Sequence, residues 1–481
     1  MSEPHLIVLF GATGDLAKRK LLPGIMHLLG SGLVQDLRLI GVSRHQYDDA
    51  EFREFVEQAC REFSKRPIVE EHLSEFLKRL AFVPVGEGPE ALAKQAAEYE
   101  AELRSSHGVE PGRLHYLSVP PSAALSTIET LHTADLVDRA KVVMEKPFGT
   151  DLESARELNA SIHEILDERQ IYRIDHFLGK EAALNILAFR FANGLFEPIW
   201  NRNFIDHVQI DVPETLGLEG RAGFYEGTGA FKDMVVTHLF QVMAFMAMEP
   251  PTALDSGAIG EEKNKVFRSM LPLDVTKVIR GQYVGYREQE GVDPNSDTET
   301  FIALRAEIDN WRWADVPFYL RTGKRLGEGT RIISIAFREP PKSMFPDDSG
   351  IGESGPDHLT FDLRDVSRMS LSYYGKDPGP GMRLQKLSMQ FDTAETADAE
   401  DVLEAYERLV YDAIRGERTL FTTAAGIERL WEVAAPLLEN PPELEFYEPG
   451  AYGPDSVQEL IAPGRWRLPF ERKWRESNGR K

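Results

Sequence analysis

The stretch "HLIVLFGATGDLAKRK", residues 5–20, decides the fold of the first part of the chain. Residues 5–10 are mostly apolar, as in a buried strand, and they run directly into a turn that contains Gly11 and Gly14. Gly11, Gly14 and Ala17 have the spacing G-x-x-G-x-x-A, close to the fingerprint of dinucleotide-binding loops. Small residues let the backbone approach a pyrophosphate, and the next helix offers its N–H groups. We predict a nucleotide-binding loop here; a plain tight turn between strand and helix is the alternative.

The end of the second predicted strand, residues 37–42, indicates which dinucleotide is bound. A side chain that reads the ribose 2′-hydroxyl would be Asp or Glu at this point. The chain instead has Ser43, Arg44 and His45, with no acid before Asp48. Ser43 and Arg44 can donate hydrogen bonds to a 2′-phosphate, because the arginine fork is planar and permanently charged. This favours NADP over NAD, although an ordinary loop arginine would look the same.

The rest of the chain predicts an α/β protein with two domains. Apolar runs that alternate with amphipathic stretches predict an N-terminal doubly wound Rossmann domain over residues 1–174. Later strands alternate apolar and polar residues and are separated by Gly, Pro, Asp and Ser, which is typical of an antiparallel sheet with one covered face. We therefore predict an α+β domain with a large, mainly antiparallel sheet over residues 175–481. Such a sheet also suggests a homo-oligomer, a homodimer or homotetramer.

Composition excludes several classes of partner. The 481 residues carry 55 basic and 78 acidic side chains, a formal charge of −23, which disfavours nucleic acid and anionic membranes as partners. The single cysteine, Cys60, excludes an intramolecular disulfide framework and a cysteine-based metal cluster. We expect no metal site. The N-terminal stretch has no basic leader and no window approaches 18 apolar residues, so we expect a cytoplasmic protein.

The stretch "RIDHFLGKE", residues 173–181, crowds ionisable groups around one glycine. Leaving a strand, Asp175 and His176 would point to opposite faces and could serve two tasks. If a helix then begins, His176 and Lys180 stand four residues apart and can meet one anion together. A solvated domain junction is the alternative.

Together with "GATGDLAKRKLLP", the runs "EKPFG" (145–149) and "RIDHFLGKE" closely resemble the glucose-6-phosphate dehydrogenase family. The resemblance continues in "TGAFKDMVVTHLFQVMAFMAMEPP", "VPFYLRTGKRL", "AYERLVYDAIRGERTLF" and "YEPGAYGPD", and so covers essentially the whole chain. It implies oxidation of glucose 6-phosphate at C1 to the 6-phospho-lactone, with hydride transfer to NADP. This reaction is the entry step of the pentose phosphate pathway.

The resemblance also implies roles for individual residues. His238 matches the general base, and Asp175 matches the carboxylate that orients it. His176 and Lys180 match the phosphate-binding pair, and the other substrate-binding residues it implies are Lys146, Glu214, Asp233 and Lys324. The implied cofactor-binding residues are Gly11, Thr13, Gly14, Asp15, Leu16, Ser43, Arg44, Tyr116 and Lys146. Pro147 is expected to follow a cis peptide bond.

Four features depart from a simple match. Phe177 stands where many members have tyrosine, so a hydrogen bond to the phosphate is lost. Gly329 stands where many members have a basic residue, which Arg325 or Arg331 could replace.

Asp233 and His238 would lie about 140° apart on a regular α-helix, so both reach one ligand only if the helix is distorted or points end-on into the site. The basic residues of the second, structural NADP site of larger members find no match, so we expect that site to be absent.

Two other classes of function compete. Sugar and inositol dehydrogenases share the architecture, but they typically carry G-x-G-x-x-G, lack "RIDHFLGKE" and act on unphosphorylated substrates. The cationic set of His176, Lys180, Lys146 and Lys324 argues against them, because a neutral sugar gives these charges no partner. A pseudo-enzyme would be expected to lose the base, its orienting carboxylate or the glycine loop, all of which are present.

Overall fold

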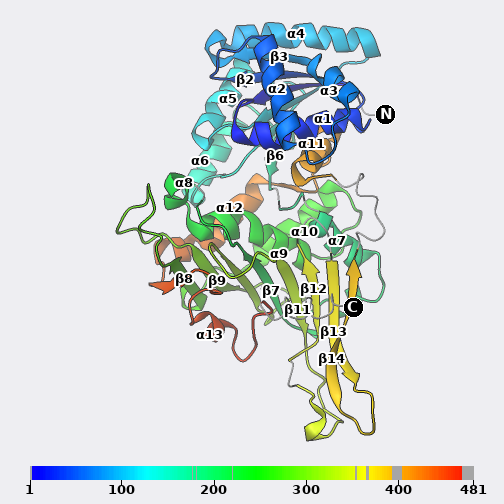
Figure 1. Cartoon of the computed structure of the whole chain (residues 1–481), viewed down its shortest axis with the longest axis vertical. Coiled ribbons are helices and arrows are strands. Elements are labelled where there is room, and N and C mark those ends of the chain that lie inside the picture. The colour runs from blue at the N-terminus through cyan, green and yellow to red at the C-terminus, as the bar shows by residue number, and fades with distance from the viewer. Residues whose placement is uncertain are drawn as a thin grey trace. The chain divides into compact units, whose positions relative to one another are not determined.

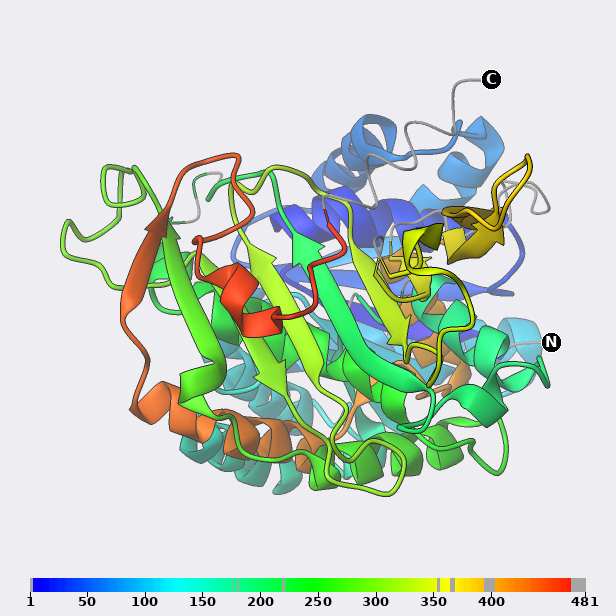
Figure 2. The ribbon, with the colours of Figure 1, turned by 90° about the horizontal axis from the view of Figure 1, so that it is seen from below.

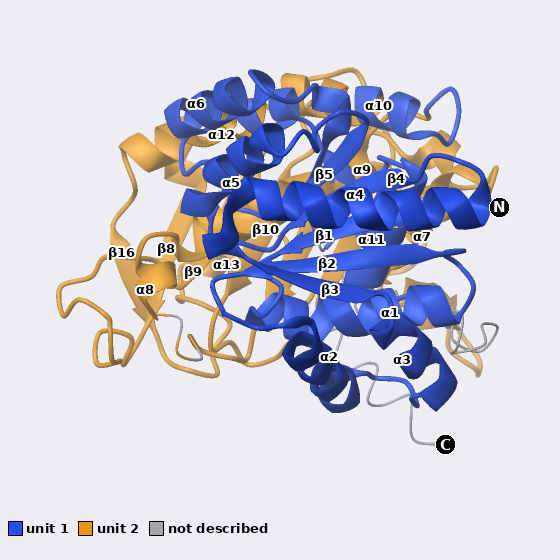
Figure 3. Ribbon diagram, turned by 90° about the horizontal axis from the view of Figure 1, so that it is seen from above, with its two compact units in different colours: residues 1–179, 251–261, 403–428 blue, residues 180–250, 262–402, 429–481 orange. Residues whose placement is uncertain are grey.

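The computed structural model of the chain describes residues 3–175, 177–179, 181–218, 220, 222–352, 355–363, 368–392 and 403–468 (Figures 1 and 2). It divides into two compact units (Figure 3). The first comprises residues 1–179, 251–261 and 403–428, and the second comprises 180–250, 262–402 and 429–481. We predicted two domains that are each one continuous stretch of sequence, with a single boundary between residues 174 and 175. This division stays a prediction.

The first unit is built on a seven-stranded sheet in the order β15-β6-β5-β4-β1-β2-β3. All neighbouring strands are parallel except β15, which pairs antiparallel with β6. This order is that of a doubly wound sheet, so the predicted Rossmann fold is confirmed. The strands are β1 (His5–Phe10), β2 (Leu37–Ser43), β3 (Leu80–Pro84), β4 (Gly112–Leu117), β5 (Ala140–Met144), β6 (Ile171–Ile174) and β15 (Phe421–Thr422).

Helices connect these strands. The first begins as a π-helical turn, η1 (Ala17–Leu21), and continues as α1 (Leu22–Gly30). The others are α2 (Asp49–Phe63), α3 (Glu70–Leu77), α4 (Gly88–His107), α5 (Pro121–Thr133) and α6 (Leu152–His163), with short 3₁₀ turns η2 (Val85–Glu87) and η3 (Glu168–Gln170).

A helix from near the end of the chain completes this unit. Helix α11 (Ala405–Arg415) packs against α1, β4 and β5. Arg66 donates to Glu407 at 2.8 Å, and Lys20 donates to Glu404 at 3.0 Å. The buried face of α11 also covers apolar surface, so a segment more than 380 residues from Lys20 belongs to the nucleotide-binding unit.

The second unit contains a nine-stranded sheet in the order β14-β13-β12-β11-β7-β10-β9-β8-β16. Only the pairs β7–β10 and β8–β16 are parallel, so the predicted mainly antiparallel sheet is confirmed. The strands are β7 (Ile205–Pro213), β8 (Val278–Tyr283), β9 (Phe301–Ala306), β10 (Phe318–Gly323), β11 (Ile332–Phe337), β12 (His358–Asp362), β13 (Arg368–Lys376), β14 (Leu384–Asp392) and β16 (Leu444–Tyr447).

Helices lie on both faces of this sheet. Helices α7 (Glu181–Phe191) and α9 (Phe240–Ala247) lie on one face, and α13 (Val457–Ile461) lies on the other, against β8 and β9 (Figures 1 and 2). The remaining elements are α8 (Ala222–Glu226), α10 (Ser256–Ser269), α12 (Ala424–Glu439), η4 (Glu197–Ile199), η5 (Phe231–Leu239), η6 (Val275–Lys277) and η7 (Asp347–Ser349). No helix in the described part of the chain is long and apolar enough to cross a membrane.

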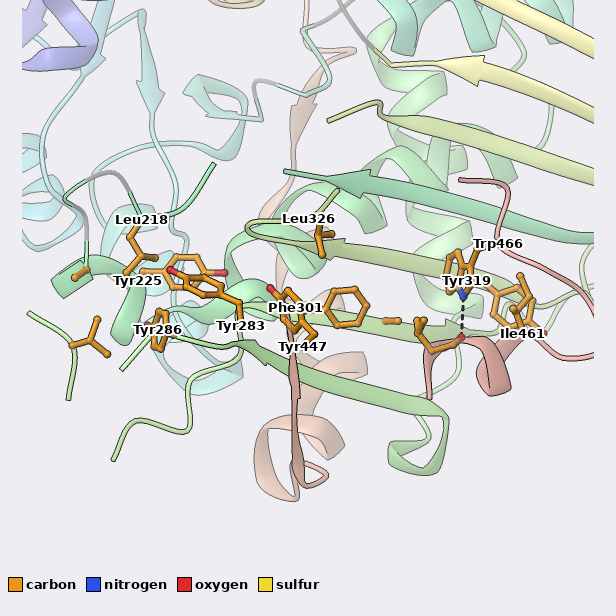
Figure 4. Close-up of a cluster of buried hydrophobic side chains, with 14 residues drawn as sticks. Leu218, Tyr225, Tyr283, Tyr286, Phe301, Tyr319, Leu326, Tyr447, Ile461 and Trp466 are labelled. Atoms are coloured by element: carbon orange, nitrogen blue, oxygen red, sulfur yellow. Dashed lines mark hydrogen bonds between the residues drawn. The ribbon is translucent and has the colours of Figure 1, made fainter. Parts of the chain in front are cut away.

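An aromatic cluster fixes the end of β10 in the second unit (Figure 4). The Tyr283 and Tyr286 rings meet edge to face with centroids 5.5 Å apart, a favoured aromatic geometry. The Tyr447 hydroxyl donates to the carbonyl of Lys324 at 2.7 Å and lies 3.0 Å from the Thr300 hydroxyl. The backbone of Lys324, the residue after β10, is therefore held in place by the buried side chain of Tyr447.

Helix α9 is anchored at its C-terminus by three side chains. The fully buried guanidinium of Arg190 donates to the carbonyls of Phe245, Met246 and Met248 at 2.8–3.1 Å. The indole N–H groups of two buried tryptophans add bonds of 2.8 Å and 2.6 Å to the carbonyls of Met246 and Ala247; these are Trp200 and Trp313. Carbonyls at a helix end have no partner within the helix, so these donors stabilise it, and the positive charge suits the dipole.

We predict that Arg190→Met lowers the free energy of unfolding by about 3 kcal/mol or more, because it leaves three buried carbonyls without their charged donor and leaves Glu197 with Arg312 as its one remaining cation among the described residues. Urea denaturation followed by fluorescence measures this loss. Arg383→Met is the control, since Arg383 is exposed and its side chain bonds no described residue; it should change stability by less than about 0.5 kcal/mol. Equal effects of the two substitutions would contradict the anchoring role of Arg190.

Candidate active site

The glycine loop turns sharply at the carboxyl end of β1. Gly11 has φ +71°, and a Cβ there would lie 1.9 Å from the Ser118 carbonyl oxygen, so only glycine fits. Its N–H donates to the Val42 carbonyl at 2.8 Å, and that of Gly14 donates to Gly11 at 2.8 Å. The helical run then begins at Asp15 and Leu16, with Asp15 exposed and paired with Arg19. This turn leaves the start of a helix facing the end of the sheet, which suits a pyrophosphate.

The end of β2 carries hydroxyl and cationic groups and no available carboxylate. Ser43 is buried and its hydroxyl accepts from Thr13 at 3.0 Å, while Arg44 is exposed and makes no side-chain hydrogen bond or ion pair with any described residue. Asp48, the first acid after β2, accepts from the N–H groups of Ala50 and Glu51 as the N-cap of α2. Its carboxylate therefore serves its own helix, and the groups that remain suit a 2′-phosphate.

The ends of β4, β5 and β6 bring three predicted residues to the same edge of the sheet. Tyr116 is buried near the end of β4, and its hydroxyl donates to Glu145 at 2.6 Å. Lys146 follows Glu145 after β5, and the predicted cis bond to Pro147 is confirmed. Asp175 is buried directly after β6, and its Oδ1 accepts from the Phe177 N–H at 2.8 Å. Ligands of doubly wound sheets bind at this edge.

Glu145 is an ionisable group that we did not predict from the sequence. Burial raises its pKa to about 7 and the charge of Asp175 adds to this, while the Tyr116 hydrogen bond and Lys146 oppose it. Burial also raises the pKa of Tyr406 on α11 above its usual range, and Glu145 contributes. In the sequence, Glu145 is visible as the acid within "EKPFG". Tyr116 and Asp175, which also act on its pKa, come from distant positions in the chain.

In the second unit, the parallel strands β7 and β10 end side by side and bring Glu214 and Lys324 together. The two side chains form an ion pair, and Arg331 lies 3.5 Å from the other oxygen of Glu214. Gly329 leaves open space, with its nearest neighbour, Thr215, 3.9 Å from where a Cβ would be. Of the two arginines that could replace a basic residue at 329, Arg331 therefore lies beside a predicted substrate residue. Arg325 instead lies over the Tyr283 ring.

Asp233 and His238 lie on a helix that is not a regular α-helix. The segment η5 is π-helical, and the N–H of Phe240 bonds to the Val235 carbonyl five residues back. A π-helix has a wider turn than an α-helix, so residues five apart lie much nearer to the same side, and Asp233 and His238 approach a common face. This removes the conflict that a regular helix posed. The helix that carries both residues is therefore distorted, as two residues on one side of it require, and it continues as the regular helix α9.

The π-helical segment packs against β10, the strand that Lys324 directly follows. Burial raises the pKa of Tyr225 well above its usual range, and the charges of Glu299, Asp233 and Glu214 add to the shift. Lys324 lies over the Tyr225 ring at 5.5 Å. Tyr225 therefore lies beside Lys324 and within electrostatic range of Asp233 and Glu214, although nothing in the sequence pointed to it.

Two predicted residues, His176 and Lys180, lie outside the described residues. Their neighbour Phe177 is buried, and α7 begins at Glu181. The described residues contain no group of three or more His, Cys, Asp or Glu side chains that could hold a metal ion.

Comparison with known proteins identifies the family. The model of the "glucose-6-phosphate dehydrogenase, NAD binding domain" matches residues 8–185, and that of the C-terminal domain matches residues 187–475. The chain belongs to the glucose-6-phosphate dehydrogenase family. NADP is the cofactor of this class of oxidoreductase, so the preference inferred at the end of β2 agrees with the family.

Individual relatives match over their full length. The glucose-6-phosphate 1-dehydrogenase of Aggregatibacter actinomycetemcomitans is 39% identical, over 97% of this chain and 98% of that protein. The crystal structure of the Mycobacterium avium enzyme has a TM-score of 0.85 at 33% identity, covering 98% and 99% of the two chains. A glucose-6-phosphate dehydrogenase in complex with its substrate has a TM-score of 0.88 at 31% identity, covering 97% and 98%.

We predict that Glu145 makes stability depend on pH. Its pKa is raised from 4.5 to about 7, so its contribution is complete below pH 4.5 and is lost as pH rises through 7. Glu145→Gln removes this loss, and the variant should gain about 1 kcal/mol relative to the parent between pH 6 and pH 8. Urea denaturation at both pH values measures the difference. The exposed Glu129→Gln is the control; a constant offset for Glu145→Gln would sink this prediction.

Proposed function

We propose that this protein oxidises glucose 6-phosphate at C1 to 6-phosphoglucono-lactone and transfers the hydride to NADP, as the entry step of the pentose phosphate pathway. The observation that carries the proposal is the joint presence of the glycine loop and a substrate half with paired cations and carboxylates. Full-length similarity to enzymes of this name supports it. The bound nicotinamide supplies the hydride acceptor, and the protein supplies binding, orientation and a base.

The cofactor half is proposed to lie along the edge of the first unit's sheet. Gly11, Thr13, Gly14, Asp15 and Leu16 would hold the pyrophosphate at the start of the helical run. Ser43 and Arg44 would hold the 2′-phosphate, and the exposed, unengaged guanidinium of Arg44 supports this role. Tyr116 and Lys146, near the ends of β4 and β5, would lie on the nicotinamide side.

The substrate half is proposed to combine cations for the phosphate with carboxylates for the sugar. His176 and Lys180 would bind the phosphate, and Lys146 would contact substrate and cofactor together. Glu214 and Asp233 would accept hydrogen bonds from sugar hydroxyls, with Lys324 donating. The ion pair of Lys324 with Glu214 supports a shared site for these two, and Arg331 is a candidate third cation there.

The chemical step needs one base and one orienting group. His238 would take the C1 hydroxyl proton as the hydride leaves C1, since imidazole changes charge near working pH. Asp175 would hold the imidazole and stabilise its charged form, as the aspartate of a catalytic triad does. Burial of both side chains supports these roles, because an electrostatic interaction is stronger where water is excluded.

An unphosphorylated sugar is the second candidate substrate. Full-length similarity to enzymes named for the phosphorylated sugar argues against it. A cytoplasmic location and a homodimer or homotetramer complete the proposal.

We predict that His238→Asn keeps glucose 6-phosphate binding within a few-fold of the parent while turnover falls by about 10²–10⁴. Calorimetric titration with substrate and initial-rate assays measure the two quantities separately. His163→Asn is the matched control, since His163 lies on α6 and pairs with Glu168 in the first unit. Near-parental turnover of His238→Asn would remove His238 from the mechanism.

A further inference from the structure

The start of the helix that carries Asp233 and His238 is bound by a residue from another part of the second unit, Glu299. The N-cap of η5 is Ala230, whose side chain cannot accept a hydrogen bond. Glu299 accepts two bonds there: its Oε1 from the Phe231 N–H at 3.0 Å, and its backbone carbonyl from the Ala230 N–H at 3.0 Å. The first N–H groups of a helix have no carbonyl partner within it, and negative charge suits this end of the dipole. A residue 68 positions away therefore caps this helix.

The Glu299 carboxylate is itself held in one position. Its Oε2 accepts from Nη2 of Arg280 on β8 at 3.2 Å. The same guanidinium donates to the carbonyls of Asp297 at 2.8 Å and Pro442 at 3.0 Å. Both side chains are buried. Each carboxylate oxygen thus has its own partner, so Glu299 is a fixed point against which the helix begins.

Gly229, directly before the N-cap, makes room for this carboxylate. It has φ +64°, and a Cβ there would lie 2.4 Å from Oε1 of Glu299. Only glycine combines this backbone conformation with so close an approach. The second glycine of "GTGAF", residues 227–231, is therefore explained by Glu299.

Glu299 lies close to the proposed sugar-binding carboxylates but does not share their role. Its charge, together with those of Asp233 and Glu214, adds to the raised pKa of the buried Tyr225. Both oxygens of Glu299 are engaged by Phe231 and Arg280, so it acts on the backbone rather than on a ligand.

The two proposed site residues of the helix depend on this cap to different degrees. Asp233 lies in the first turn of η5, next to the backbone that Glu299 binds. His238 lies nearer to α9, whose last carbonyls Arg190 holds. Loss of the cap would fray the first turn and displace Asp233 more than His238.

We propose that Glu299 is a positioning residue that fixes Asp233 for glucose 6-phosphate through the backbone of Ala230 and Phe231. The proposal rests on the proposed function, in which Asp233 accepts hydrogen bonds from sugar hydroxyls. Those bonds exist in the bound substrate as well as in the transition state. Their loss therefore weakens substrate binding and leaves kcat nearly unchanged.

The test compares the parent with Glu299→Ala, Glu299→Gln and Gly229→Ala. Calorimetric titration with glucose 6-phosphate and initial-rate assays measure Kd and kcat separately. We expect Glu299→Ala to raise Kd about ten-fold while kcat stays within about three-fold of the parent. Gly229→Ala should do the same, since its Cβ displaces the carboxylate. Glu299→Gln should stay close to the parent, because its amide oxygen can still accept from the Phe231 N–H.

A double-mutant cycle separates positioning from a general loss of structure. If Glu299 acts through Asp233, Glu299→Ala should weaken binding little further in an Asp233→Ala background. Calorimetric titration with NADP is the control for folding, because the glycine loop proposed to bind it lies in the first unit, and all the variants should bind it as the parent does.

The contradicting outcomes are distinct. Parent-like substrate affinity in Glu299→Ala, alongside weakened binding in Asp233→Ala, would overturn the role of Glu299. So would losses that simply add in the double variant, because Glu299 would then act independently of Asp233. Unchanged affinity in Asp233→Ala would contradict the proposed sugar-binding role of Asp233, and this proposal with it.

Discussion

The helix from Phe231 to Ala247 is the constraint on which the proposed substrate site depends, because it carries both Asp233 and His238. At its start, the Phe231 N–H donates to the Glu299 carboxylate at 3.0 Å, and at its end Arg190 and two tryptophans bind the last carbonyls. A helix held at both ends cannot rotate to present one residue without the other. Its π-helical first half instead changes the spacing at which residues share a face.

The first unit brings its predicted site residues together without a distorted helix. Five parallel strands, β1, β2, β4, β5 and β6, all end at one edge, so residues separated by more than 160 positions reach the same place. Its less regular feature is the set of buried groups behind this edge. Tyr116 on β4 and Tyr406 on α11 surround Glu145, so the end of the chain shapes the setting of Lys146. Burial of these polar groups is costly unless they are satisfied, which favours a fixed arrangement.

The sequence predicted the features that local pattern controls. The glycine loop, the parallel strands and the antiparallel sheet follow from spacing and periodicity. The roles of residues such as Glu214 and Lys324 come from the family resemblance and stay predictions. It could not predict the π-helix of η5, because no residue type specifies that hydrogen-bond register. The Tyr116–Glu145 bond and the place of α11 depend on contacts between distant segments. Tyr225 was missed for the same reason.

The most direct measurement of the central claim is the initial rate of nicotinamide reduction with glucose 6-phosphate or free glucose, each against NADP and NAD. The account predicts turnover only with the phosphorylated sugar, and a higher kcat/KM with NADP than with NAD. Equal rates with NAD would contradict the assignment of the 2′-phosphate to the end of β2. Absence of reduction with every pair, in folded protein that binds NADP, would contradict the proposed reaction itself.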